Sequence, residues 1–555
     1  MKPNPSRLCI AWEAAEMARP TTQVRRPAEQ GSKAQPRSVS VRMYRDILGD
    51  CFLLRVPDGD RTRHILIDCG ILQGMPGATE QANRIMADIK SVTTVLDVLV
   101  VTHEHVDHLS GFEQAKSIFS EVTVSELWLA WTEDPRDEQA MRLRAGREKV
   151  KTLLAKSYTA FANYKSFMSH PEYSDDEDPS EADGEPLEPG PLDELSSVLA
   201  FAGIGPDGPG VKSASSTAAI LERLKLKAER VRYMTPGTKP ELGFASGIGV
   251  YVLGPPRDEK LLRRSDPRKN HAEVYQLSGD VGEDYLLAAS VMLEGEDSSL
   301  DADDLQRLQM SLPFGLRAMV PLDNRLAEIG LRTDDAARST ALLSYDDPAN
   351  DWRKVDIDWL GATEALALKL DSDTNNTSLV LAFELGEGPH GRVLLFPGDA
   401  QIGSWLSWHD LTWPPGAQKG DIDSVNVADL LAKTVLYKVG HHASHNATPR
   451  EFGLELMTHP DLVAMIPVEE AFANNSKHWK MPFRALLDRL VEKTGGRVIR
   501  ADRAKADIKA YADDTLSIEL QLDARQWQSF FDNLDEISDH QGPLALEYRI
   551  PYSTS

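Results

Sequence analysis

Residues 103–108 place three histidines and two acidic side chains in six consecutive positions, in the segment VTHEHVDHLSGF. The apolar run LDVLVV at 96–101 precedes them and is typical of a buried strand. Crowded neutral imidazoles beside carboxylates suit a metal ion. His103 and His105 alternate and would turn to one side of the chain, whereas Asp107 and His108 would be aimed at a second point. The spacing predicts two adjacent metal positions, and a solvated histidine-rich loop is the alternative.

Strand-like segments surround this cluster. VSVRMYRDI, CFLLRVP and HILIDCG come before it, with a short helical stretch at 78–89. A second strand-rich part contains NNTSLVLAFEL, RVLLFPGDA, TVLYKVG and LVAMIPV, followed by the helix FRALLDRLVEK and the strand RVIRAD. Its alternation of strands and helices is typical of half of an α/β layered sandwich.

The remaining segments divide the chain into six predicted parts. The helical spacing of Val150, Leu154, Tyr158 and Phe161, and the stretch at 216–234, favour helices in an insertion. Residues 172–194 contain eleven acidic residues and no Lys or Arg, which predicts a solvated linker. The expected parts are a disordered N-terminal segment at 1–38, the first half of the sandwich at 39–120, a mainly helical insertion at 121–245, a strand and mixed insertion at 246–374, the second half of the sandwich at 375–505, and a C-terminal extension at 506–555.

Charge and hydropathy exclude some partners. The formal net charge is −25 over 555 residues, which repels phosphate backbones and anionic membranes at long range and disfavours nonspecific duplex binding. No segment approaches the roughly 18 to 20 continuous apolar residues of a membrane span. We therefore expect no membrane partner, and the oligomeric state has no signal in the sequence.

The cysteines and the N-terminal sequence indicate the cellular compartment of the protein. Cys9, Cys51 and Cys69 are too few and too unevenly spaced for a disulfide framework or a thiolate zinc site, which favours a reducing environment. The first residues lack the charged start, apolar run and small-residue cleavage site of a secretory signal. We expect a cytoplasmic protein.

HxHxDH after a β-branched apolar strand resembles the metallo-β-lactamase-fold hydrolases. LIDCG at 66–70 is similar to the family's early strand that ends in a structural aspartate, here Asp68. LLFPGDA at 394–400 is similar to the strand that delivers a metal-bridging carboxylate, here Asp399. The resemblance implies an α/β fold, an αββα sandwich with helical insertions, and a dinuclear site at one edge of its two packed sheets.

Within that family the chain most resembles the ComEC-type branch, the soluble hydrolase domain of bacterial DNA-uptake proteins and its free-standing relatives. The matching segments are LGDCFLL at 48–54, NNTSLVLAF at 375–383, LLFPGDA, and YKVGHHASHNATP at 437–449. Together they cover about half of the chain.

The resemblance also implies a ligand set. His103 and His105 would bind one metal, and Asp107 and His108 the other. Asp399 would bridge the two metals, and one histidine of the pair His441 and His442 would complete the second site. Asp107 would also be catalytic, because its family counterpart orients the attacking water.

The sequence departs from the family at the first metal. Many members add a third histidine between the first cluster and the bridging aspartate, but this interval holds only His170, His271 and His390, none in a recognisable motif. His271 is the best of the three. His105 stands where oxygen-reducing di-iron relatives place a carboxylate, so two divalent zinc ions are expected, with manganese as the alternative.

The reaction expected of such a site is hydrolysis by metal-activated water. The ComEC-type resemblance favours a phosphodiester substrate, either nucleic acid or nucleotide, whereas the net charge favours a small substrate. An ester, lactone or amide hydrolase would share every ligand, and a metal-stabilised scaffold for partner binding is a further alternative. Basic or imidazole side chains that could line a phosphate pocket, with ordinary surface residues as the alternative reading, are Lys438, His445, Arg450 and Lys477.

Overall fold

The computed structural model describes residues 37–168, 196, 198–204, 216–245, 247–264, 366–386, 390–414, 424–477 and 479–553. The predicted acidic linker at 172–194 lies outside these residues, as does the predicted disordered N-terminal segment up to residue 36.

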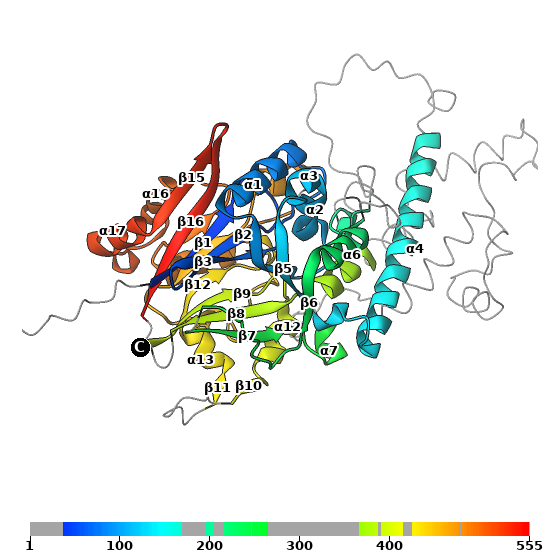
Figure 1. Ribbon diagram of the computed structural model, residues 1–555. Coiled ribbons are helices and arrows are strands. Elements are labelled where there is room, and N and C mark those ends of the chain that lie inside the picture. The colour runs from blue at the N-terminus through cyan, green and yellow to red at the C-terminus, as the bar shows by residue number, and fades with distance from the viewer. Residues whose placement is uncertain are drawn as a thin grey trace, which may run out of the picture. The chain divides into compact units, whose positions relative to one another are not determined.

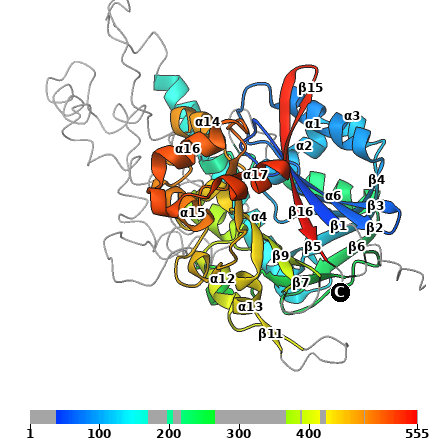
Figure 2. The same cartoon turned by 90° about the vertical axis from the view of Figure 1, so that its left-hand side faces the viewer.

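Two mixed sheets form the centre of the protein (Figures 1 and 2). The first sheet has eight strands in the order β15 (Leu534–Asp539), β16 (Gly542–Tyr552), β1 (Arg37–Tyr44), β2 (Phe52–Asp58), β3 (Arg61–Ile67), β4 (Val95–Val100), β5 (Thr123–Ala130) and β6 (Ala228–Met234). The second has six, in the order β14 (Val498–Arg500), β13 (Val463–Ile466), β12 (Thr434–Lys438), β9 (Arg392–Phe396), β8 (Val380–Leu385) and β7 (Ile248–Gly254). A separate pair is formed by β10 (Thr412–Trp413) and β11 (Val425–Asn426).

Each sheet changes from antiparallel to parallel pairing. In the first sheet β3, β4, β5 and β6 are parallel neighbours, and in the second sheet β9, β12, β13 and β14 are. Parallel strands need crossover connections, which are usually helices. The helices therefore cover the outer faces: Figure 1 shows α1–α3 over the first sheet, and α12 and α13 beyond the second.

The helices within the described residues have the following bounds. They are α1 (Ala78–Val92), α2 (Val106–Gln114), α3 (Lys116–Phe119), α4 (Glu138–Met168), α6 (Thr217–Lys227), α7 (Glu259–Leu262), α12 (Ile402–Trp408), α13 (Val427–Ala432), α14 (Glu470–Ser476), α15 (Arg484–Thr494), α16 (Asp507–Thr515) and α17 (Ala524–Asp532). Single 3-10 turns occur at Trp131–Glu133, His441–Ala443, Leu454–Leu456 and Ile518–Leu520. Residues 366–375 are also helical and lead directly toward β8.

Alternating side chains of the strands build two apolar layers. On β4, the consecutive residues Val98, Leu99 and Val100 alternate: Val98 and Val100 face the core between the sheets, whereas Leu99 faces the helices on the outside. This is the period of two expected when both faces of a strand are buried. The rings of Phe52 on β2 and Phe396 on β9 are 5.8 Å apart and join the two sheets. The predicted α/β layered fold is confirmed.

Several elements differ from the sequence prediction. The stretch at 216–234, expected to be one helix, is helical only to Lys227 and then forms β6, whose charged side chains lie at the edge of the first sheet. β5 and β6 thus belong to the sheet, although they lie inside the range predicted to be a mainly helical insertion. The predicted C-terminal extension contains β15 and β16, and β16 pairs with all of β1, from Arg37 to Tyr44.

The parallel strands end at one edge of the sandwich. The loops that follow β3, β4, β9 and β12 carry the Asp68, His103–His108, Asp399 and His441–His442 side chains. In α/β sheets the carboxyl ends of parallel strands are the usual place for ligand sites. The fold therefore brings residues that are hundreds of positions apart to a common edge.

Candidate metal centre

The first cluster lies where β4 ends and α2 begins. His103, Glu104 and His105 lie between the two elements, and α2 starts at Val106, so that Asp107 is in its first turn. Free backbone N–H groups at a helix start favour negative charge there. All the side chains from His103 to His108 are buried.

Close backbone packing fixes this helix start. Backbone N–H groups of Asp50 and Cys69 donate to the carbonyls of Asp107 and His108, both at 2.9 Å. A Cβ on Gly70 would lie 2.1 Å from the backbone carbon of Asp107, a distance that no side chain can occupy. The glycine of LIDCG is therefore needed for the approach of the β3 loop to the cluster.

His103 and His105 face each other. Their Nε2 and Nδ1 atoms, respectively, are 3.0 Å apart, so the two nitrogens either share a proton or point at a common cation. The other nitrogen of His103, Nδ1, lies 3.1 Å from the Thr102 hydroxyl and 3.2 Å from the Ser378 hydroxyl. The pair is thus held with two nitrogens directed at one point.

Four further side chains converge beside this pair: Asp107, His108, Asp399 and His442. Asp107 Oδ2 lies 3.0 Å from His442 Nε2 and 3.4 Å from His108 Nε2, and Asp399 Oδ2 lies 3.2 Å from His108 Nε2. The ligand atoms of Asp107, Asp399 and His442 all lie within 4.8 Å of one another, as do those of His103, His108 and Asp399. Asp399 is common to both groups.

The outer nitrogens of two of these histidines are occupied. His108 Nδ1 lies 2.8 Å from Asp68 Oδ2, and His442 Nδ1 lies 2.6 Å from the carbonyl of Pro467. Asp68 is itself held by the N–H and the hydroxyl of Thr102. Because Nδ1 is bonded outward in both histidines, Nε2 of each is directed to the centre.

Asp399 presents one oxygen to the cluster. Its Oδ1 accepts from the His441 backbone N–H at 3.0 Å and from Lys438 Nζ at 3.1 Å. Lys438 also contacts Asp50 Oδ2 at 2.5 Å and is fully buried. These bonds leave Oδ2 of Asp399 facing His108, and they make Lys438 an internal support of the cluster.

The other side chains considered for a phosphate pocket lie elsewhere. Arg450 is exposed and lies 4.0 Å from Glu455, His445 is exposed beside the Phe483 ring, and the Lys477 ammonium lies over the Phe472 ring.

His441 and His442 are adjacent in sequence but have different surroundings. His441, His442 and Ala443 all have positive φ values, between 44° and 62°, a conformation that costs free energy in non-glycine residues and is found mainly at functional sites. His442 points into the cluster. His441 Nδ1 lies 2.9 Å from the Ser444 hydroxyl, while its Nε2 is buried without a hydrogen-bond partner among the described residues.

Burial and the mixture of charges shift the pKa values of the cluster. Although burial opposes it, the imidazoles of His108 and His442 hold the pKa of Asp107 well below its usual range, and Lys438 and His108 do the same for Asp399. Burial lowers the pKa of His105 to about 3 and of His441 to about 4. The carboxylates act in the opposite direction on two other histidines: although burial opposes it, Asp399 and Asp107 raise the pKa values of His108 and His442. Metals bind ionised carboxylates and neutral imidazoles, so these two histidines would release a proton when a metal binds.

The cluster has acceptors without donors. Among the described residues, buried atoms near the centre that lack a hydrogen-bond partner are Asp50 Oδ1, Asp107 Oδ1, Asp371 Oδ1, Asn375 Oδ1 and His441 Nε2. Buried polar atoms are normally satisfied. An excess of unpaired oxygen and nitrogen acceptors is what a cation would satisfy, so these residues fit divalent metal ions.

Two features of the site had no sequence signal. Phe201, from the segment between α4 and α6, lies over the cluster, with ring centroids 5.7 Å from His105 and 5.9 Å from His441. It stacks on Trp479 at 4.7 Å with the planes 11° apart, and its carbonyl accepts from the Val106 N–H at 2.9 Å. Asp371, just before β8, has Oδ1 3.9 Å from His105 Nε2.

Glu104, between the two facing histidines, connects the cluster to the inserted helices. Its Oε1 accepts from Lys151 Nζ of α4 at 2.7 Å and from the Thr217 hydroxyl of α6 at 2.9 Å. All three residues are buried. The position of the metal-facing loop therefore depends on α4 and α6.

The candidates for a third histidine do not join the cluster within the described residues. His390 is exposed at the start of β9. His170 and His271 lie outside the described residues.

Comparison with known proteins supports the fold. No curated protein and no solved structure matched the chain. No helix in the described part is long and apolar enough to cross a membrane. The family model of the metallo-beta-lactamase superfamily matches residues 44–207, which include the His103–His108 cluster but neither Asp399 nor His442. The chain therefore contains a metallo-beta-lactamase superfamily domain at residues 44–207, and its two-sheet α/β architecture is consistent with the metallo-β-lactamase fold.

Proposed function

We propose that this protein is a hydrolase that depends on two divalent metal ions and acts on a phosphodiester. The observation that carries the proposal is the convergence of Asp399 and His442 on the His103–His108 cluster, with Asp399 common to both groups of ligand atoms. Members of the superfamily are usually hydrolases.

The proposed ligands follow from the directions of the ring nitrogens. His103 Nε2 and His105 Nδ1 would hold the first ion, and Asp107, His108 Nε2 and His442 Nε2 the second, with Asp399 Oδ2 between them. Of the two adjacent histidines, His442 is chosen because its Nε2 lies among the ligand atoms of Asp107 and Asp399, whereas His441 Nδ1 faces the Ser444 hydroxyl. Four imidazoles suit zinc, and manganese is the alternative.

Two such ions would supply a nucleophile at neutral pH, by lowering the pKa of water, and would stabilise the charge that develops on the attacking and leaving oxygens. The chain's own residues position the reactants. Asp107 uses Oδ2 toward His442 and His108, which leaves Oδ1 as the acceptor that would orient a water molecule. Phe201 packs against the rings of His105, a proposed ligand, and of His441 beside it.

The substrate class rests on the motifs that resemble the ComEC-type branch. The net charge of −25 and the burial of the cluster favour a small phosphodiester, such as a nucleotide, over a long duplex. An ester, lactone or amide substrate would use the same ligands. The buried free cysteines Cys51 and Cys69 support a reducing compartment, which we take to be the cytoplasm.

The test is turnover of three substrate classes by protein loaded with zinc or manganese. We expect hydrolysis of bis-p-nitrophenyl phosphate that exceeds hydrolysis of nitrocefin and of a simple lactone. Faster turnover of nitrocefin or the lactone would contradict the substrate class alone. Full metal binding with no turnover of any of the three would instead favour a metal-stabilised scaffold.

A further inference from the structure

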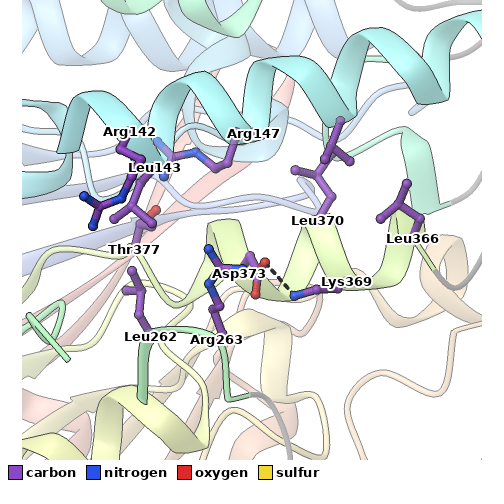
Figure 3. A pocket seen from close by; sticks show the side chains of 12 residues that line it. Arg142, Leu143, Arg147, Leu262, Arg263, Leu366, Lys369, Leu370, Asp373 and Thr377 are labelled. Carbon is purple, nitrogen blue, oxygen red and sulfur yellow. Dashed lines mark hydrogen bonds and ion pairs between the residues drawn. The ribbon is translucent and has the colours of Figure 1, made fainter. Parts of the chain in front are cut away.

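Asp371 lies on the helical segment at residues 366–375 that enters the site from the chain before β8. Figure 3 shows the other side of this segment, where Leu366, Lys369, Leu370 and Asp373 line a cavity against α4, and Asp373 pairs with Lys369 at 3.0 Å. Asp371 does not line that cavity. Its carboxylate instead comes within 4 Å of His105 Nε2.

The surroundings of Asp371 do not stabilise a buried carboxylate that has only a structural role. Its Oδ2 accepts from Asn375 Nδ2 at 3.0 Å, but its Oδ1 has no hydrogen-bond partner among the described residues. The charges of Asp107 and Asp399 repel it, and only 11% of its side chain is exposed. An unsatisfied carboxylate beside two others destabilises the protein unless something else binds it or the groups around it.

In each of the other histidines of the proposed centre, the outer ring nitrogen has a hydrogen-bond partner. The outer nitrogen of His108 is held by Asp68, that of His442 by the Pro467 carbonyl, and that of His103 by two hydroxyl groups. His105 turns Nδ1 toward His103, so Nε2 is its outer nitrogen, and Nε2 faces Asp371 Oδ1 at 3.9 Å. Histidines that bind metals almost always donate their other N–H to a carboxylate, a carbonyl or water.

We propose that Asp371 is the positioning residue of the first metal site: it accepts the Nε2–H of His105 and so leaves the lone pair on Nδ1 for the metal. This inference rests on the proposed dinuclear function. A carboxylate partner makes the imidazole a stronger ligand, which matters at a site where His390, the described candidate for a third histidine, is exposed. At 3.9 Å the two atoms are farther apart than in a hydrogen bond, so the proposal requires a small shift of one of the two side chains in the occupied site.

The experiment is metal titration against a competing chelator, followed by metal content, for wild type, Asp371→Ala and Asp371→Asn. Asp373→Ala is the matched control, since it removes a carboxylate two positions away that faces the cavity. We expect Asp371→Ala to weaken one of two equivalents about 10- to 100-fold and to leave the other unchanged. Asp371→Asn, which keeps an acceptor oxygen, should lose less, and the control should match wild type.

Thermal unfolding of the metal-free proteins separates positioning from a structural role. Because Asp371 is repelled and partly unsatisfied without metal, Asp371→Ala should unfold at or above the wild-type temperature. Unchanged affinity for both equivalents, or a weakening of both together with a lower unfolding temperature, would overturn the inference. A wild-type protein that binds fewer than two equivalents would overturn the proposed function as well.

Discussion

At the scale of single residues, the two oxygens of Asp107 have different surroundings. Oδ2 contacts His442 and His108, and Oδ1 is buried without a partner among the described residues. Asp107→Asn keeps the shape but replaces one oxygen by a donor. We expect kcat for bis-p-nitrophenyl phosphate to fall by about 10²- to 10⁴-fold, the range for a group that handles a proton or orients the nucleophile. A kcat within threefold of wild type, at full metal content, would remove Asp107 from the mechanism.

Two neighbouring histidines provide a paired test of the second metal site. His442 Nε2 lies among the ligand atoms, whereas His441 does not belong to either group. His442→Ala should therefore lower metal content from two equivalents toward one, while His441→Ala keeps two. Metal analysis after dialysis measures this, and the opposite pattern would show that the ligand is assigned to the wrong residue.

Residue types alone predict only part of the site. The adjacent ligands from His103 to His108 form a pattern that can be read directly, but Asp399 was expected only through a resemblance. The choice between His441 and His442 depends on three successive positive φ values, which residue types do not predict. Asp371 and Phe201 belong to no motif, because their importance comes from tertiary contact alone.

At the scale of elements, α4 and α6 hold the metal-facing loop through the buried carboxylate of Glu104. Lys151→Met would leave this charge with the Thr217 hydroxyl as its remaining bond, and removing one partner of a buried pair costs about 3–5 kcal/mol. We expect urea unfolding to show a loss of this size. The double variant Glu104→Gln/Lys151→Met should recover most of it, and a double variant as unstable as Lys151→Met would contradict the pairing.

The same pair predicts a dependence of stability on pH. Although burial opposes it, Lys151 and Arg147 lower the pKa of Glu104 from 4.5 to about 2 in the folded protein. The stabilisation is therefore present above pH 4.5 and is lost as the pH falls toward 2. Relative to Glu104→Gln/Lys151→Met, the wild type should lose free energy of unfolding across this range. A difference that stays constant between pH 5 and pH 2.5 would contradict the assignment.

Elements with a strong apolar signal were predictable, and those without one were not. The apolar runs LDVLVV and RVLLFPGDA were predicted to be strands, and they contain β4 and β9, which are mostly buried. β6 was expected to continue a helix because AERVRYM carries charged residues, which are tolerated at the sheet edge where it lies. β15 and β16 lie far from the motifs in sequence, so their pairing with β1 could not be anticipated.

In the molecule as a whole, the C-terminal strands β16 and β15 extend the first sheet beyond β1. Two parts of the chain that are distant in sequence place their site residues at one edge of the sandwich. The superfamily match ends at residue 207, yet the proposed centre needs Asp399 and His442 from the second half. We therefore expect both halves of the chain to hold one pair of ions.

Anomalous diffraction from crystals grown with zinc, recorded at the zinc absorption edge, would show whether both halves of the chain hold the ions. We expect two peaks, one between His103 and His105 and one among Asp107, His108 and His442, with Asp399 contacting both. No peak at these residues, or zinc only at surface histidines, would contradict a metal centre shared by both halves of the chain.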